Sequence, residues 1–312
     1  MRFKFKRTPF TRDDKQRFPL EDGARVAVVG GGPAGSFFSY FALKMAETIG
    51  LEFEVVIYEP RFFTHRGPAG CNHCGGIISE SLVQYLALEG INLPGTVVQR
   101  GIDSYMLHMD VGNVRIETPL RESRIAAVHR GNGPRESEIL GFSGFDRYLQ
   151  ECAIDRGARI ERQLVNGIEW DSGLPRVRFP GGSGETFDLV AVASGVNSQL
   201  LASIEGFDRR KQAPRTVKSF IAEFRLGRDT IKRHLGTSMH VFLLDLPRLE
   251  FAAIVPKGDF ATLALLGHDI DGELIQNFLD SRPVRECFPG LVVPRNACHC
   301  YPRMNILGPD RP

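Results

Sequence analysis

The stretch that decides the fold is Arg25-Val-Ala-Val-Val-Gly-Gly-Gly-Pro-Ala-Gly-Ser36, in which a short apolar run breaks into glycines and continues with helical spacing. It predicts a β-strand, a phosphate-binding turn and an α-helix in succession. Gly30, Gly32 and Gly35 stand at the Gly-x-Gly-x-x-Gly spacing. In such a turn the first glycine permits a tight bend, the second lets the backbone approach a pyrophosphate, and the third brings the helix close to the sheet. The helix start then offers N–H groups and a positive dipole end to the phosphates.

Both flanks of this turn support a βαβ unit. Val26 to Val29 form an uninterrupted run that is typical of a parallel strand buried on both faces. Residues 36 to 50 have apolar side chains at helical spacing, and residues 51 to 59 predict a second strand that ends in Glu59. An acid at that place binds the ribose hydroxyls of an adenine dinucleotide. The alternative is an ordinary βαβ turn with a solvated Glu59, and the turn alone allows NAD, FAD or neither.

Length and composition limit the classes of protein. The 312 residues suffice for two domains or one large domain with an inserted lobe, and 42% hydrophobic residues support a folded core. A net charge of +2 does not favour nucleic acid as a partner. The basic, aromatic residues 1 to 24 predict an edge strand or packed arm, with contact to an anionic membrane surface as the alternative. With few cysteines, no apolar run of about 20 residues and no secretory signal, we expect a cytoplasmic protein, with peripheral membrane contact as a second option.

A cysteine-rich loop carries the first resemblance to a known family. The segment from Pro60 to Ser79 contains Cys71-Asn-His-Cys-Gly-Gly76 and leads into a predicted helix. With Glu59 before it, this loop resembles that of the geranylgeranyl reductase family, FAD-dependent oxidoreductases built like p-hydroxybenzoate hydroxylase. The resemblance implies that Cys74, Gly75 and Gly76 lie beside the flavin ring. Two positions depart from the family pattern, Ile77 in place of a glycine and Glu80 in place of a proline.

Two later segments are similar to the same family. Residues 145 to 161 predict a helix that begins Phe-Asp-x-x-Leu and then a strand, which resembles the return of the chain to the dinucleotide domain. Val165 then matches a position whose backbone meets the adenine. Residues 188 to 198 resemble the second fingerprint of the family, with Ser194 in place of its aspartate. An ordinary strand-to-helix turn capped by Asn197 or Ser198 is the alternative. The predicted cofactor contacts are Gly30, Gly32, Pro33, Ala34, Gly35, Glu59, Arg61, Gly75, Gly76, Val165, Ser194, Gly195 and Asn197.

The rest of the chain is predicted to be rich in β-structure. Alternating apolar residues indicate three antiparallel strands within residues 101 to 130 and four more strands within residues 216 to 268. Residues 249 to 266 are similar to a family segment that borders an isoprenoid tunnel, and Phe251 keeps one of its aromatic positions. Residues 303 to 312 lack the Gly-Asp turn that the resemblance implies, so we expect a truncated or naturally short form.

The cysteines leave three interpretations open. Cys71 and Cys74 form a Cys-x-x-Cys pair, and Cys298 and Cys300 form a Cys-x-Cys pair. Ordinary reduced thiols on two loops are the favoured interpretation, and a redox dithiol is the second. A metal site of all four, for zinc or an iron–sulfur (Fe–S) cluster, is the third. Cys152 and Cys287 lie in helical patterns and predict core positions.

Together these features predict an α/β flavoprotein with a Rossmann-like FAD-binding domain and an inserted antiparallel β-rich substrate lobe. The predicted domains are residues 1–100 with 140–210 for FAD, and 101–139 with 211–312 for substrate. The expected activity is hydride transfer through FAD to or from a small apolar, isoprenoid- or quinone-like substrate, with NAD(P)H as a candidate electron donor. Cys74 and His73 are the catalytic candidates by position. The alternatives are a flavin hydroxylase of the same fold and a flavin- or Fe–S-bearing electron-transfer or binding subunit.

Overall fold

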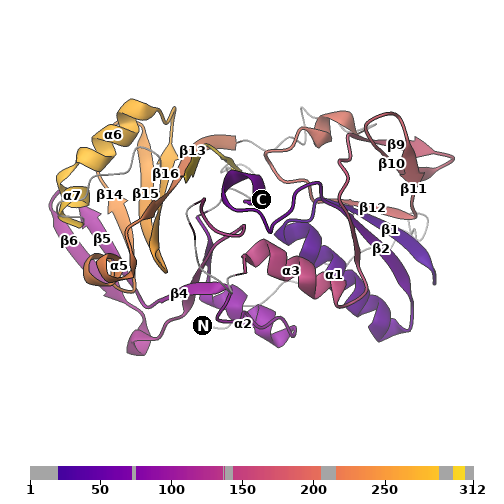
Figure 1. The fold of residues 1–312 in the computed structure, drawn as a ribbon, viewed down its shortest axis with the longest axis horizontal. Coiled ribbons are helices and arrows are strands. Elements are labelled where there is room, and N and C mark those ends of the chain that lie inside the picture. The colour runs from indigo at the N-terminus through magenta and orange to yellow at the C-terminus, as the bar shows by residue number, and fades with distance from the viewer. Residues whose placement is uncertain are drawn as a thin grey trace, which may run out of the picture.

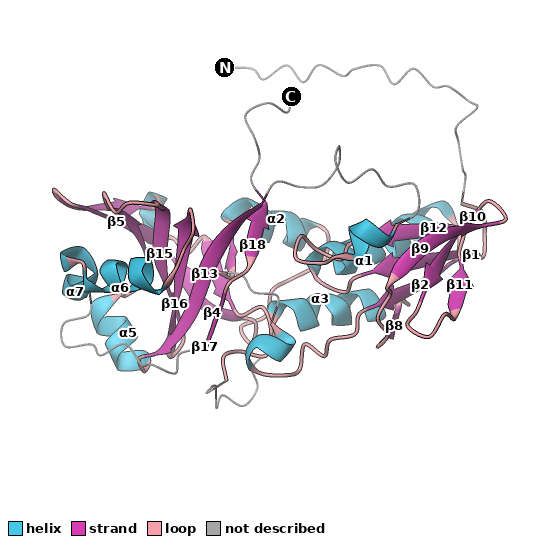
Figure 2. Cartoon of the chain, turned by 90° about the horizontal axis from the view of Figure 1, so that it is seen from above, coloured by secondary structure: helices cyan, strands magenta, loops and turns pink. Residues whose placement is uncertain are grey.

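The computed structural model describes residues 20–71, 75–135, 137, 143–204, 216–287 and 298–305. Figure 1 shows two lobes side by side, one built on a parallel sheet and the other on a larger, mostly antiparallel sheet. From above, the molecule is elongated, with these two sheets at opposite ends (Figure 2). The predicted α/β class is confirmed.

A parallel sheet forms the centre of the first lobe. In the described chain it contains four strands in the order β12-β1-β2-β8, and neighbouring strands are parallel throughout. Val26 of the central strand lies between Val55 and Leu189, and it is 1% exposed. Strands flanked on both sides and covered on both faces need continuous apolar runs, which explains the sequence of β1. The strands are β1 (Ala24–Val29), β2 (Phe53–Tyr58), β8 (Arg159–Glu161) and β12 (Leu189–Val192).

Two helices pack beside this sheet and against one another: α1 (Pro33–Ile49) and α3 (Phe145–Ile154) (Figure 1). A proline in its first turn starts α1, and Gly50, with φ of 71°, ends it in the left-handed conformation. A small antiparallel sheet beyond β8, absent from the sequence-based prediction, adds a layer over Tyr58. Its strands are β9 (Gly167–Asp171), β10 (Leu174–Arg178) and β11 (Gly184–Thr186).

The larger sheet has eight strands in the described residues, and β14 and β5 are its parallel pair. Helices α5, α6 and α7 cover one face, with Phe242 and Phe278 in the core between (Figure 1). The strands are β5 (Ser104–Met109), β6 (Gly112–Glu117), β13 (Thr216–Arg225), β14 (Ser238–Leu243), β15 (Leu249–Lys257), β16 (Phe260–Gly267), β17 (Cys298–Cys300) and β18 (Arg303–Asn305). The helices are α5 (Arg228–His234), α6 (Gly272–Asp280) and α7 (Arg282–Cys287).

The prediction of three antiparallel strands within residues 101–130 is wrong in its pairing. β5 and β6 do form an antiparallel pair in the large sheet. The third strand, β7 (Ile125–Val128), instead lies between β3 (Ile77–Ile78) and β4 (Val98–Ile102) in a separate small sheet, next to helix α2 (Glu80–Leu88). All four residues of β7 are buried, and a strand buried on both faces has no alternation that assigns it to one partner. The predicted domain boundary at residue 100 falls inside β4, and the division into domains stays a prediction.

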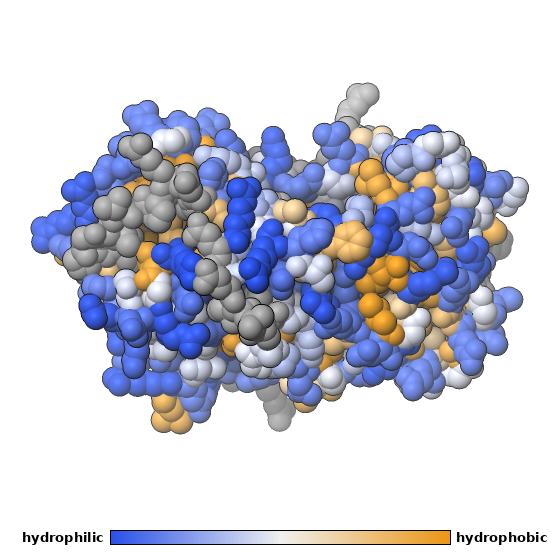
Figure 3. Space-filling model, viewed as in Figure 1, coloured by the Kyte–Doolittle hydropathy of each residue, from blue (hydrophilic) through white to orange (hydrophobic). Residues whose placement is uncertain are grey.

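The surface in Figure 3 is mostly hydrophilic, with hydrophobic residues gathered over the lobe of the parallel sheet. In the described chain, no helix is both long and apolar enough to cross a bilayer. The N-terminal arm predicted for residues 1 to 24 lies almost wholly outside the described residues.

Helix α6 provides a pH-dependent prediction for the stability of the large lobe. Asp271 caps α6 by accepting a hydrogen bond from Leu274 N at 2.9 Å, and Arg248 donates to its carboxylate at 2.7 Å. The bond from Arg248 is the main cause that lowers the pKa of Asp271 from 3.8 to about 2. A depressed carboxyl pKa stabilises the fold above the unfolded-state pKa, and the contribution is lost as pH falls through the folded-state value.

Asp271→Asn keeps the cap and removes the charge. We expect its urea midpoint to lie below that of the wild type near pH 7. The difference should shrink as pH falls from about 4 to about 2. A difference that stays constant over this range would contradict the assignment.

Candidate functional site

The glycine turn lies where β1 ends, against the end of β12. Gly30 has φ of 108°, and a Cβ there would overlap the carbonyl group of Ala193. A Cβ on Gly35 would overlap the carbonyl oxygen of Gly30, so the helix and the turn approach more closely than any side chain allows. Both glycines are therefore required by the packing of the backbone, as the motif predicts.

The first turn of α1 presents N–H groups that no side chain caps. Gly32 is the N-cap residue, with φ of −71° and ψ of −173°, and Pro33 and Ala34 begin the helix. The first N–H groups of a helix have no partner within it. Because the N-cap residue is a glycine, it has no side chain of its own that covers these groups. This cradle fits a pyrophosphate, whose negative charge the helix dipole also favours.

Glu59 follows β2 and is buried, with 3% of its surface exposed. Its Oε2 accepts a hydrogen bond from Gly31 N at 3.0 Å, and its Oε1 accepts from Arg61 N at 3.1 Å and from Arg61 Nε at 3.2 Å. A carboxylate has about four acceptor positions, so these bonds leave about one for another donor. The predicted acid therefore lies directly beside the glycine turn. The guanidinium of Arg61 lies over Glu59 and also donates to Cys71 O.

The sequence analysis missed two residues that complete this network. Gln150, on α3, donates to Gly31 O at 2.9 Å. Arg162, just after β8, donates to Gln150 Oε1 at 3.3 Å and to the carbonyl oxygen of Arg61. Burial lowers the pKa of Arg162. Both residues lie in or next to a segment that resembles the geranylgeranyl reductase family. Their side chains reach the turn and the segment after β2 only because the chain folds back, so no local sequence pattern identifies them.

The second predicted fingerprint also lies beside the turn. A Cβ on Gly30 would lie 3.0 Å from Ser194 Cα, and Gly195 has φ of 78°. Asn197 caps no helix; its side chain accepts from Arg303 N at 2.9 Å and so ties this segment to β18. Ser198 accepts from Leu200 N at 3.1 Å, but the short 3₁₀ helix Leu200–Ser203 has Gln199 as its N-cap residue, so neither alternative is the cap.

Val165 is placed differently from the other predicted contacts. Its side chain is 5% exposed and packs in the core with Ala27, Val29 and Tyr58. The structure thus gives its side chain a packing role. The predicted contact of its backbone with adenine stays a prediction.

The glycines of the cysteine-rich loop lie between the two lobes. His73 and Cys74 fall outside the described residues, so their predicted catalytic roles stay predictions. Gly76 has φ of 68°, and its carbonyl accepts from Val128 N at 2.8 Å. A Cβ on Gly76 would overlap Val128 O and would lie 2.7 Å from Lys257 Nζ. Among the described residues, no atom lies within 4 Å of a Cβ position on Gly75.

A buried charge pair next to Gly76 was not predicted. Lys257 is 1% exposed, and its Nζ lies 3.7 Å from Glu223 Oε1. Glu223 Oε2 also accepts from Thr262 Oγ1 at 2.8 Å. His129 is buried nearby, and its burial and the charge of Lys257 lower its pKa well below 6.5, so its ring is neutral at pH 7. Lysines are almost never fully buried without a paired charge, and Glu223 provides that charge here.

A cavity of about 40 Å³ lies between the lobes next to this pair. It is lined by Glu223, His129 and three of the cysteines that the sequence analysis selected, Cys71, Cys298 and Cys300. Strand β17 and the short 3₁₀ helix Gly67–Gly70 bring the two cysteine segments together. The segments thus meet in space, but Cys74 lies outside the described residues and the four-cysteine metal site stays a prediction.

Arg130 also lines this cavity and is held by a buried acid. It donates from Nε and Nη2 to the two carboxylate oxygens of Asp146 at 2.8 and 2.7 Å. Asp146, in the first turn of α3, is fully buried. The pair joins the segment after β7 to α3 at the border of the two lobes.

Comparisons with known proteins support the fold of this chain. No protein-family model matches the chain. One curated relative, the chloroplastic geranylgeranyl diphosphate reductase of Arabidopsis thaliana, is 29% identical over 202 residues, covering 59% of this chain. The match spans about a third of that relative, 36% of its length.

Solved structures show the same fold at low sequence identity. A geranylgeranyl bacteriochlorophyll reductase-like protein from Thermoplasma acidophilum is 17% identical with a TM-score of 0.59, covering 91% of this chain and 67% of that one. A flavin-dependent brominase is 16% identical with a TM-score of 0.62, covering 90% and 67%. 2-Methyl-3-hydroxypyridine-5-carboxylic acid oxygenase is 18% identical with a TM-score of 0.59, covering 90% and 70%. The comparisons confirm the predicted flavoprotein fold, a Rossmann-like domain with a β-rich lobe, and the resemblance of this chain to geranylgeranyl reductases.

Proposed function

We propose that this chain is an FAD-dependent oxidoreductase that transfers hydride through the flavin to or from an apolar, isoprenoid- or quinone-like substrate. The observation that carries the proposal is the glycine turn, where backbone atoms occupy the space of any side chain at Gly30 and Gly35 and an uncapped helix follows. The chain's likeness to geranylgeranyl diphosphate reductase supports the reaction class.

Different residues at the turn would bind different parts of FAD. Gly32 and the first N–H groups of α1 would bind the pyrophosphate, and the remaining acceptor position of Glu59 would take a ribose hydroxyl. Gln150 holds the turn through its hydrogen bond to Gly31 O, and Arg162 in turn donates to the Gln150 side chain. FAD, when bound, supplies the hydride chemistry.

Lys257 would tune the site electrostatically. By resemblance the Gly75-Gly76 segment runs beside the flavin ring, and Lys257 Nζ lies against Gly76. A buried ammonium favours negative charge on a neighbouring group, because little solvent screens it there. Glu223 balances this charge at 3.7 Å, so the pair holds a fixed dipole at the border of the cavity.

An anaerobic reoxidation experiment tests the proposal. The full chain, loaded with FAD and reduced by NAD(P)H or dithionite, is mixed without oxygen with a geranylgeranyl compound or a quinone, and flavin absorbance is followed. We expect reoxidation faster than that of unbound FAD, and slower reoxidation in Lys257→Met with FAD retained. No reoxidation by these compounds, together with peroxide or a hydroxylated product in a parallel run with oxygen, would contradict the proposal in favour of a hydroxylase. Electron passage to a partner protein alone would favour an electron-transfer subunit.

A further inference from the structure

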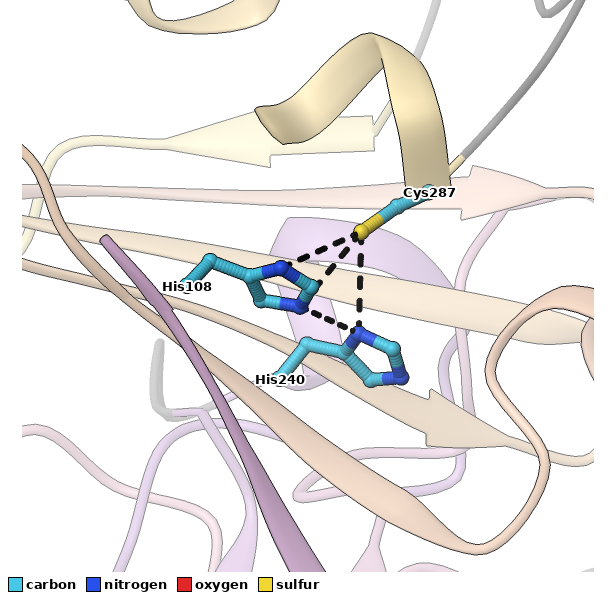
Figure 4. Close-up of side chains that lie close together, drawn as sticks. All are labelled: His108, His240 and Cys287. Carbon is cyan, nitrogen blue, oxygen red and sulfur yellow. Dashed lines mark hydrogen bonds between the residues drawn. The ribbon is translucent and has the colours of Figure 1, made fainter. Parts of the chain in front are cut away.

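A second cluster of reactive side chains lies in the large lobe, apart from the cavity between the lobes. His108 of β5, His240 of β14 and Cys287 at the end of α7 point toward one another (Figure 4). All three are buried, with 4%, 5% and 7% of their surfaces exposed. Their sequence positions lie 132 and 47 residues apart, so only the fold brings them together. None of them lines the cavity next to Lys257. The sequence analysis assigned Cys287 to the core, and the structure adds two histidines to its surroundings.

Two of the three distances among these side chains match a set of metal ligands, and the third is shorter. His108 Nε2 lies 2.9 Å from His240 Nδ1, and Cys287 Sγ lies 3.5 Å from the first nitrogen and 3.7 Å from the second. Tetrahedral zinc with ordinary bond lengths holds two nitrogens about 3.4 Å apart and a nitrogen and a sulfur about 3.6 Å apart. The two distances from Cys287 Sγ to the ring nitrogens agree with this geometry. The two nitrogens must move apart by about half an ångström to bind the same ion.

The outer ring nitrogens determine where the protons are. His240 Nε2 lies 3.3 Å from Leu235 O, and a backbone carbonyl can only accept, so this nitrogen donates. His108 Nδ1 lies 3.0 Å from Asn113 Oδ1, which also accepts. With both rings donating from these outer nitrogens, the two inner nitrogens, 2.9 Å apart, are left as acceptors that a cation can bind. Metal-bound histidines have this same second partner on the outer nitrogen.

Metal ions bind neutral imidazole rings through such lone pairs. The single S–H of Cys287 can donate to one of the two nitrogens only. A cation between the three atoms satisfies both nitrogens and the sulfur at once.

We propose that His108, His240 and Cys287 bind a divalent transition-metal ion, with Zn²⁺ as the ion that matches the nitrogen and sulfur ligands best. Among the described residues, these are the three that form such a group, and a water molecule would complete the four ligands. The metal fastens α7 to the parallel strands β5 and β14. Because its ligands come from three distant segments, its binding energy contributes to the folding of the large lobe.

Metal analysis of the purified full chain tests this proposal. We expect about one Zn²⁺ per chain by elemental analysis and, after exchange, a Co²⁺ spectrum with a thiolate-to-metal band. Cys287→Ser and His240→Gln should lose at least tenfold in metal affinity in chelator competition. Cys152→Ser and His268→Gln are the matched controls, since Cys152 is half-buried on α3 and His268 is exposed, and both should keep the metal.

Cys298→Ser separates this site from the four-cysteine alternative, because it should leave the metal content unchanged. X-ray absorption at the zinc edge of the wild-type protein gives an answer even where a variant fails to fold. We expect two nitrogen ligands and one sulfur ligand. A protein that binds no metal, a metal retained in Cys287→Ser, or a spectrum of three or four sulfur ligands would each overturn the proposal.

Discussion

Asp146→Asn is expected to lower the free energy of unfolding by about 3 kcal/mol. Asp146 is fully buried and accepts both hydrogen bonds of the Arg130 fork. The substitution keeps the size of the side chain but removes the Asp146 carboxylate from the guanidinium, which is 15% exposed. Breaking a buried pair by removing one partner costs more than the pair itself contributes, because the remaining charge stays desolvated.

Helix α3 offers the control for this prediction. Arg147 and Glu151 form an exposed pair one turn apart on the same helix, at 2.7 Å. Glu151→Gln should change the free energy of unfolding by less than about 0.5 kcal/mol. Chemical unfolding followed by circular dichroism measures both variants. Equal effects of the two substitutions would show that the buried pair does not hold the border of the lobes.

Gly35→Val is expected to weaken FAD binding by about 10- to 100-fold or more, which corresponds to the loss of one or two charge-assisted hydrogen bonds. A Cβ at this position would overlap Gly30 O, so α1 must move away from the turn. The N–H groups of its first turn then no longer point at the pyrophosphate. Gly95→Ala is the matched control, since nothing lies within 4 Å of its Cβ position.

Gly32→Ala separates binding from folding. Gly32 has an extended backbone that alanine adopts without strain, so we expect the variant to unfold like the wild type. Because Gly32 is the N-cap residue beside the first N–H groups of α1, we expect the added methyl group to lower FAD affinity. Titration of FAD into each variant by fluorescence quenching measures the effect. Unchanged affinity in both variants would remove the turn from the binding site.

Local patterns were sufficient to predict the parallel sheet and the turn. One βαβ unit contains the run Val26 to Val29, the three glycines and Glu59. The residue types in this unit are sufficient to predict a buried strand, a tight turn and an acid at the end of the second strand. The structure confirms the strands and helix that this pattern predicts, and it places the end of β12 beside the turn.

The remaining parts depend on contacts between distant segments. β7 pairs with β3 and β4. This pairing could not be predicted, because the fully apolar sequence of β7 carries no preference for one neighbouring strand. Lys257 looks like an ordinary strand-end lysine until Glu223 and Gly76 are found around it. Cys287 likewise looks like a helical core residue until His108 and His240, on two strands, are found beside it. Such side chains have no signature in sequence, since their partners come from elsewhere in the chain.

The central claim is that the turn at Gly30 to Gly35 holds FAD. The absorbance spectrum of the purified full chain, before and after incubation with FAD and gel filtration, tests it most directly. The account predicts the two visible bands of protein-bound flavin at about one FAD per chain, and a much smaller amount in Gly35→Val. A spectrum with aromatic absorbance alone after this incubation would contradict it.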